Sequence, residues 1–320
     1  MSGNIQPILE TISAEDISNG TRNSMKDAFS KLHPITNLLF FVFSIGFAMF
    51  INHPVCIVLS IIAAGINAVY LNGKKAVLLS VKFLLPLIIL TSIINPVFNH
   101  QGATIIEYLP WGNPLTLESI IYGITAAVLL SSAVLWFSCF NSVMTSDKFV
   151  YLFGRIMPSL SLVLSMALRF VPRFNAQLKE VRKAQKALGS DLSDGTIITR
   201  IKHSVKIISL MITWSLENAI DTSDSMKSRG YGLKGRTSFS IFKFTSKDAY
   251  CISAMLAEVL TLIVFILFGC IRSRYYPTIK GNLLDMQAII FYIIYFIFLL
   301  TPMIINVGEG IKWKLLKSAI

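Results

Sequence analysis

The segment SMKSRGYGLKGR, residues 225–236, has the residue types of a phosphate-binding loop. Its three glycines follow the spacing G-x-G-x-x-G, and Gly235 with Arg236 resembles the end of a phosphate loop. A dinucleotide motif needs a strand before the glycines and a helix after them, and a phosphate loop needs a lysine where Arg236 stands. A helical pattern precedes these glycines instead. We therefore interpret Gly230 as a helix cap and expect no nucleotide site.

Three acidic residues just before this segment have the spacing of one helix face. Glu217, Asp221 and Asp224 stand at i, i+4 and i+7. Membrane prenyltransferases use aspartates to hold magnesium and diphosphate, which makes a membrane-embedded, magnesium-dependent enzyme of that type the alternative function. Their dense D-x-x-x-D pairs are absent here, and no second acidic cluster occurs. Lys227 follows Asp224 at the spacing of a helical ion pair, so we favour ion pairs over a metal site.

Arg229 stands at the expected end of the helix that carries these acids. An arginine in the last helical turn can complement the helix dipole and bind the free carbonyl groups. Alternatively, its planar guanidinium can project into an acidic groove on a partner protein. Gly230 beside it would let the partner's backbone approach closely. Both interpretations remain open from the residues alone.

Two amphipathic helices are predicted to position this chemistry. The first covers 173–189 and the second runs from about Thr196 to Arg229. Their apolar residues recur at helical spacing: Phe174, Leu178, Val181, Gln185 (polar, within the stripe) and Leu188 in the first, and Ile197, Ile201, Val205, Ile208 and Ile212 in the second. Each helix ends in a basic turn followed by a glycine, Gly189 or Gly230, at a C-cap position.

The composition is that of an integral membrane protein. Of 320 residues, 54% are hydrophobic and only 14% are charged, compared with about 25% in soluble domains. The net charge of +12 fits cytoplasmic lysine and arginine rather than nucleic-acid binding. The four cysteines are expected to act as small apolar residues. The four histidines do not have the spacing of metal ligands. We therefore expect no metal, no cofactor and no catalytic residue.

Six apolar segments have about the length needed to cross a bilayer: 35–51, 54–71, 77–95, 117–140, 250–271 and 287–307. They predict an all-α, polytopic membrane protein with about six transmembrane helices and long amphipathic cytoplasmic helices. Lys82 lies near the start of the third span and is expected to reach the interface. Glu258 lies deeper in the fifth span, where it is either functional or paired with a neighbouring helix.

The distribution of lysine and arginine predicts the orientation. Both occur before the first span, and Lys74 and Lys75 lie between the second and third, whereas residues 95–116 contain neither lysine nor arginine. The positive-inside rule then places both termini in the cytoplasm. A basic loop at 272–286 departs from this rule. We predict a cytoplasmic tail over 1–34, transmembrane helices over 35–145, a cytoplasmic and interfacial helical module over 146–249, and C-terminal transmembrane helices with a cytoplasmic tail over 250–320.

Ser228-Arg229-Gly230-Tyr231-Gly232 resembles the signature of a known family. The chain resembles the transmembrane T component of energy-coupling factor (ECF) transporters, the EcfT/CbiQ family, where Ala-Arg-Gly commonly ends a coupling helix and Tyr-Gly follows. The segments NPVFNHQGAT, LFGRIMPSLSLVLSMALRFVPRF and WSLENAIDTSDSM are also similar to this family. The specific resemblance covers about residues 95–245.

The resemblance implies a coupling scaffold in the bacterial cell membrane. Two cytoplasmic ABC ATPases would bind the tips of the two coupling helices, and a separate membrane S component would bind a vitamin or metal ion. ATP hydrolysis would reside on these partner subunits, so the resemblance implies that this chain is not itself an enzyme. Closure of the ATPases on ATP would move the helices and tip the S component. The implied ATPase contacts are Ser228, Arg229 and Gly230 at one tip and Lys186, Ala187, Leu188 and Gly189 at the other. Met157, Leu160, Leu164 and Met166 are candidates for contact with the S component.

The first tip departs from the family pattern. The family usually carries a short arginine motif at the end of each coupling helix, but the first motif here reads Ala187-Leu188-Gly189. Lys183 and Lys186 can supply charge but not a bidentate fork. The first contact is then either weaker or made with a pocket of different chemistry. The transported substrate and the number of S components are not encoded in these residues.

Overall fold

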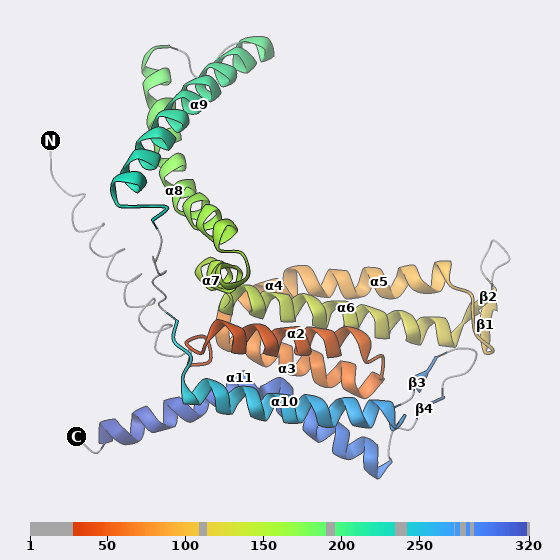
Figure 1. Cartoon of the computed structure of the whole chain (residues 1–320). Helices are drawn as coiled ribbons and strands as arrows, with labels where there is room; N and C mark the ends of the chain where they lie inside the picture. Colours follow the sequence, from red (N-terminus) through yellow and green to blue (C-terminus); the bar gives the residue numbers. More distant parts are fainter. Residues whose placement is uncertain are drawn as a thin grey trace. The chain divides into compact units, whose positions relative to one another are not determined.

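The computed structural model describes residues 28–108, 114–189, 196–233, 242–271, 273–275, 280–281 and 285–318 (Figure 1). The chain forms two compact units. One, which we call the bundle unit, comprises Met1–Thr145 and Lys243–Ile320. The other, which we call the crossed-helix unit, comprises Ser146–Phe242.

The bundle unit is built from apolar helices that lie side by side (Figure 1). They are α2 (Pro34–Phe50), α3 (Pro54–Asn72), α4 (Lys74–Leu79), a π-helical turn (Ser80–Leu84), α5 (Leu85–Phe98), α6 (Leu117–Val143), α10 (Ser246–Leu267) and α11 (Met286–Ser318). Five helical stretches in the described part of the chain are long and apolar enough to cross a membrane. The remaining apolar helix, α2, is shorter at 17 residues. The predicted all-α polytopic membrane fold is confirmed.

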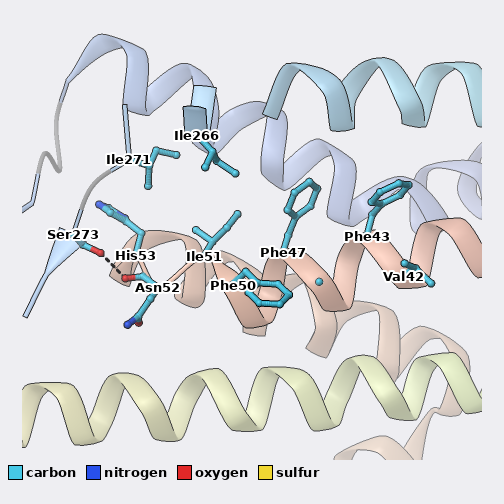
Figure 2. A pocket seen from close by; sticks show the side chains of 11 residues that line it. Val42, Phe43, Phe47, Phe50, Ile51, Asn52, His53, Ile266, Ile271 and Ser273 are labelled. Carbon is cyan, nitrogen blue, oxygen red and sulfur yellow. Dashed lines mark hydrogen bonds between the residues drawn. The ribbon is translucent and has the colours of Figure 1, made fainter. Parts of the chain in front are cut away.

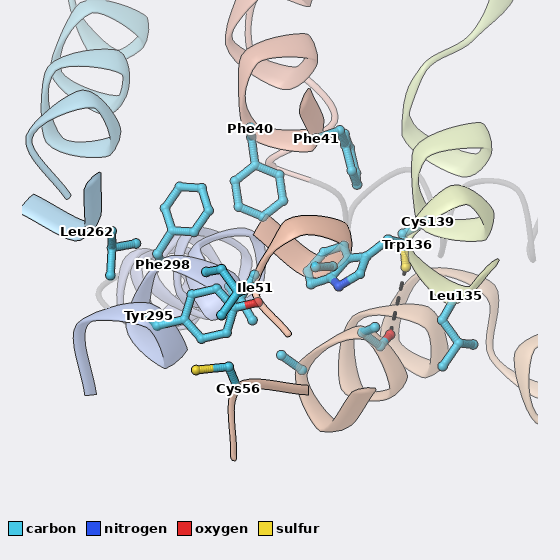
Figure 3. Packing of buried hydrophobic residues seen from close by; sticks show 14 of the residues in the cluster. Phe40, Phe41, Ile51, Cys56, Leu135, Trp136, Cys139, Leu262, Tyr295 and Phe298 are labelled. Carbon is cyan, nitrogen blue, oxygen red and sulfur yellow. Dashed lines mark hydrogen bonds between the residues drawn. The ribbon is translucent and has the colours of Figure 1, made fainter. Parts of the chain in front are cut away.

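Aromatic side chains from three helices form the centre of this unit (Figure 3). Trp136 of α6 is fully buried, and its ring centroid lies 5.9 Å from that of Phe40 in α2. Phe40 in turn lies 5.4 Å from Phe298 of α11. Such ring contacts, edge-on for Trp136 and tilted for Phe298, stabilise packing beyond the area that they bury. Cys56 and Cys139 are buried in the same core, as expected for cysteines acting as small apolar residues.

Small and polar residues let α3 pack closely in the core. Ala63, Ala64 and Ala68 are buried, which brings the α3 backbone near its neighbours. Trp136 donates its indole N–H to the hydroxyl of Ser60 at 3.1 Å. Asn67 donates to the backbone oxygen of Leu299 in α11 at 3.1 Å. These side chains therefore satisfy their hydrogen-bonding groups within the bundle, as a membrane interior requires.

Two small hairpins connect helices at one end of the bundle, and the sequence did not predict them (Figure 1). Antiparallel pairs form between β1 (Ile105–Tyr108) and β2 (Pro114–Thr116), and between β3 (Ser273–Arg274) and β4 (Lys280–Gly281). The carboxylate of Glu118 holds the first hairpin by accepting from the hydroxyl of Thr104 at 2.7 Å. A Cβ at Gly102, whose φ is +152°, would lie 2.6 Å from this carboxylate. Only glycine fits there without a shift of the loop.

Asp248 joins the start of α10 to the segment that precedes α2. One carboxylate oxygen accepts from the backbone N–H and the hydroxyl of Thr245, at 2.9 and 2.6 Å. The other accepts from the backbone N–H of His33 at 2.7 Å. Asp248 and His33 are both buried, so the N–H of His33 has no water to replace the carboxylate. The arrangement extends a capping box across two helices that are far apart in the sequence.

Asp248→Ala is expected to destabilise the bundle unit by about 2–4 kcal/mol, because it removes a helix cap and takes the acceptor away from the buried N–H of His33. The measurement is thermal unfolding of the purified chain in detergent. Asp248→Asn keeps one acceptor oxygen and should lose less. Equal melting temperatures for wild type and Asp248→Ala would contradict the inferred role.

The crossed-helix unit contains α7 (Ser146–Ile156), α8 (Pro158–Ala187) and α9 (Ile197–Ser228). α7 and α8 meet at Gly154, where an added Cβ would lie 2.7 Å from the hydroxyl oxygen of Ser161. That hydroxyl donates to the backbone oxygen of Val150 at 2.9 Å. α8 runs unbroken through Pro172, so the apolar run at 159–171 and the basic helix at 173–189 are one helix of 30 residues.

Candidate functional site

α8 and α9 cross near their midpoints (Figure 1). The ring of Trp214 in α9 stacks on Phe170 of α8 with centroids 5.6 Å apart, and Phe174 lies 6.4 Å away. The guanidinium carbon of Arg173 lies 5.9 Å from the Trp214 ring centre, which is cation–π distance. The sequence did not single out this crossing. The signal was present in Phe170 and Phe174, which are spaced i, i+4 on one helix face.

The end of α9 is a complete Schellman cap. Gly230 has a φ of +78°, and its N–H donates to the carbonyl of Lys227 at 2.9 Å. The N–H of Tyr231 donates to the carbonyl of Met226 at 3.0 Å. These are the two hydrogen bonds that define the motif. Arg229 is the C-cap residue, with φ −81° and ψ 6°, and its side chain is exposed.

The end of α8 has the same backbone conformation as the end of α9. Gly189 has a φ of +74°, and its N–H donates to the carbonyl of Lys186 at 3.1 Å. Leu188 is the C-cap residue, with φ −84° and ψ 9°. Its side chain is 72% exposed. Leu188 and Arg229 therefore occupy equivalent positions at two helix ends. The interpretation of Gly189 and Gly230 as helix caps is confirmed.

The tips lie at similar distances from the crossing. Leu188 is 14 residues beyond Phe174, and Arg229 is 15 residues beyond Trp214. At 1.5 Å per residue, each arm is about 21–23 Å long. The residues predicted to contact the ATPases are all described, and they form two separate groups. Lys186, Ala187, Leu188 and Gly189 lie at the α8 tip, and Ser228, Arg229 and Gly230 lie at the α9 tip.

The acidic residues of α9 do not form a metal site. Glu217, Asp221 and Asp224 are all exposed. The carboxylate of Asp224 lies 3.9 Å from the ammonium of Lys227, the predicted ion pair. Within the described residues, no group of three or more His, Cys, Asp or Glu side chains could hold a metal ion.

The four residues predicted to contact the S component differ in exposure, and further apolar side chains are exposed on α9. Met157 and Leu160 are about half exposed, whereas Leu164 and Met166 are partly buried. The larger exposed surface lies on α9, where all five residues of the predicted stripe are more than half exposed: Ile197, Ile201, Val205, Ile208 and Ile212. We call these five residues the α9 stripe. Helical spacing predicted them as one face, but a different face of α9, with Ile207 and Met211, is buried.

A shallow apolar groove of about 310 Å³ runs along the crossing beside the α9 stripe. It is lined by Phe174 and Leu178 of α8 and by Ile208, Met211, Ile212, Ser215 and Leu216 of α9. Grooves lined this way suit an apolar side chain or acyl chain rather than a charged ligand. The groove therefore continues the apolar surface of the α9 stripe.

The bundle unit has a second apolar groove, of about 440 Å³, between α2 and α10 (Figure 2). Its polar end is formed by Asn52, His53 and Ser273, and the Ser273 hydroxyl donates to the backbone oxygen of Asn52. Burial lowers the pKa of His53 from its ordinary value, so this side chain is neutral at pH 7. None of the residues that line the groove is a carboxylate, lysine or arginine.

Two charged residues of the predicted spans occupy different surroundings. Lys82 is exposed on the π-helical turn. Glu258 is half-buried in α10, beside the buried face formed by Met255, Val259 and Leu262. No ion pair or hydrogen bond to the Glu258 carboxylate occurs among the described residues. A structural pair with a neighbouring helix is therefore not seen in this part of the chain.

Comparison with known proteins gives the same family throughout. The model of the CbiQ family, described as cobalt transport protein, matches residues 26–239, which include both helix tips. The chain is 29% identical to the energy-coupling factor transporter transmembrane protein EcfT of Lactobacillus helveticus, over 73% of this chain and 88% of the relative. It is 28% identical to EcfT 1 of Listeria monocytogenes, over 59% and 75% respectively. A shorter match of 109 residues, 34% of this chain and 40% of the relative, is 35% identical to EcfT of Streptococcus thermophilus. The chain belongs to the CbiQ/EcfT family and is a transmembrane component of the energy-coupling factor type.

Proposed function

We propose that this chain couples two cytoplasmic ABC ATPases to a substrate-binding S component, for uptake of a vitamin or metal ion. The α8 and α9 tips bind the ATPases, and both chain termini lie in the cytoplasm. The observation that carries the proposal is the matched pair of helix ends. Each presents one exposed C-cap side chain, Leu188 or Arg229, on a long helix that crosses the other at a fixed aromatic contact.

The crossing supports the transmission of motion. A helix of 30 or 32 residues whose backbone hydrogen bonds are intact is stiff over its length. When an ATPase moves one tip, the displacement passes to the rest of that helix and to the contact around Trp214. Phe170, Phe174 and Arg173 hold this contact from the α8 side. The two tips therefore move as parts of one connected unit.

The α9 stripe supports a second contact, with the S component. Exposed apolar surface of this extent on a folded chain marks a contact with protein or membrane. The adjacent groove has no charged lining residue, which suits a partner embedded in the membrane. Met157 and Leu160 extend the proposed contact onto α8.

The proposal is tested by co-purification. The chain is tagged, solubilised from host membranes in mild detergent and analysed by quantitative mass spectrometry. We expect ABC ATPases and a small hydrophobic membrane protein to elute with it. Recovery of the chain without ATPases, at a folded elution position, would contradict the proposal.

Ile201→Glu is expected to lower recovery of the S component about tenfold while leaving the ATPases bound, because it places a charge in the α9 stripe. Thr199→Glu is the matched control. Thr199 is also exposed and lies two residues away, about 200° around the helix. Co-purification from the same membranes compares the two. Equal recovery of the S component with both variants would mean that the stripe does not contact it.

A further inference from the structure

The two tips have the same backbone conformation, but their C-cap side chains differ in chemistry. Leu188 and Arg229 have C-cap dihedral angles that agree within 3°, and a glycine of positive φ follows each. Their side chains therefore leave the helix end in the same direction relative to its axis. A partner that grips both tips in the same way meets a branched hydrocarbon at one and a guanidinium at the other.

The charges around these positions also differ. Residues 179–189 are the eleven residues that end with the capping glycine of α8. They contain four cations and one acid, which gives a net charge of +3. The equivalent eleven residues of α9, residues 220–230, contain two cations and two acids, a net charge of zero. The charged side chains of both segments are exposed. The α8 tip is thus an apolar centre within a basic rim, whereas the α9 tip is a cationic centre whose rim, without Arg229 itself, has a net charge of −1.

A pocket built for a guanidinium does not suit Leu188. Such a pocket holds a carboxylate that becomes buried when the tip docks, and leucine would leave this carboxylate without a partner. An apolar pocket gains from burying leucine, and a surrounding acidic rim would meet the four cations of the α8 end. Of these two pockets, only the apolar one matches both the centre and the rim.

We propose that Leu188 is the anchor of the α8 tip, which docks into an apolar pocket with an acidic rim on one ATPase. The pocket that receives Arg229 is acidic at its centre, so the two tips are not interchangeable. This inference rests on the proposed coupling function. Leu188 and Arg229 then act as specificity residues that assign each tip to its own site.

The test is quantitative co-purification of ATPases with the full-length chain. We expect Leu188→Arg to lower ATPase recovery about tenfold or more, because the guanidinium enters a pocket without an acceptor, whereas Leu188→Met retains the apolar contact. Leu188→Gln, which is uncharged and similar in size, should also lose recovery. Because position 188 is 72% exposed, none of these changes should alter the elution position or melting temperature of the chain.

The rim is tested separately. Replacing both Lys183 and Lys186 by glutamate should lower ATPase recovery and weaken its dependence on salt, since it reverses charges that face an acidic rim. Asp221→Lys combined with Asp224→Lys makes an equal change of opposite sign on α9 and should not lower recovery. Unchanged recovery with the α8 double variant would overturn the acidic rim.

The outcomes separate the two proposals. If wild type retrieves ATPases but Leu188→Arg retrieves as many or more, the apolar pocket is wrong and the coupling function stands. If a folded wild-type chain retrieves no ATPase, the coupling function itself fails. Loss with Leu188→Arg and Leu188→Gln but not with Leu188→Met supports the inference.

Discussion

Arg229→Glu is expected to remove the ATPases from the purified complex. Arg229 is exposed at the end of α9, and the Schellman cap of Gly230 fixes the direction of its side chain. Removing one member of a desolvated charge pair at an interface costs about 2–5 kcal/mol, and reversing the charge costs more. This corresponds to a loss of affinity of about 30-fold to several thousandfold. ATPase recovery in co-purification measures it directly.

The control for this variant is Lys227→Glu. Lys227 is exposed in the same helical turn and pairs with Asp224 at 3.9 Å, but it is not the C-cap residue. Exposed ion pairs contribute about 1 kcal/mol or less, so this change should have a small effect. If Arg229→Glu and Lys227→Glu lower ATPase recovery equally, the α9 tip attracts its partner by net charge and Arg229 has no special role.

Trp214→Ala is expected to uncouple the two helices without releasing the ATPases. It removes the ring contacts with Phe170 and Phe174 and the cation–π contact with Arg173. Together these contacts are worth about 2–3 kcal/mol. The angle between α8 and α9 should then vary more widely. Leu188 and Arg229 are unchanged, so both tips should still bind.

Distances between spin labels measure this effect. Ala187→Cys and Ser228→Cys place labels near the two tips, and Cys251 and Cys270, which are partly exposed, are first replaced by serine. Wild type should give a narrower distance distribution than Trp214→Ala. Trp214→Phe keeps a ring at the crossing and should resemble wild type. A distribution as narrow with Trp214→Ala as with wild type would show that the crossing does not depend on this side chain.

Much of the fold follows from the sequence because the bilayer imposes a strict length and polarity rule. Apolar runs of about 20 residues must be helical in a membrane, since every backbone polar group must be bonded within its own segment. The predicted spans therefore correspond to α2, α3, α4–α5, α6, α10 and α11. The caps of α8 and α9 follow equally from local chemistry, because glycine readily adopts the positive φ that ends a helix.

The contact of Glu118 with the loop around Gly102 and the contact of Asp248 with His33 did not follow, because each joins a helix to a segment outside it. Glu118 stabilises the loop around Gly102 only once α6 is in place. Asp248 meets the N–H of His33 across 215 residues. Neither pair has a signature in the spacing of nearby residues.

The sequence by itself determined that this is a helical membrane protein with two amphipathic helices that each end in an exposed C-cap residue before a glycine. Those features depend on hydrophobicity, periodicity and glycine, which act over a few residues. Tertiary structure alone decided which face of α9 packs, since the stripe at Ile201 and Val205 and the buried face at Ile207 and Met211 are both apolar. It also placed Trp214 against Phe170 and Phe174, because a ring contact between two helices depends on how they cross.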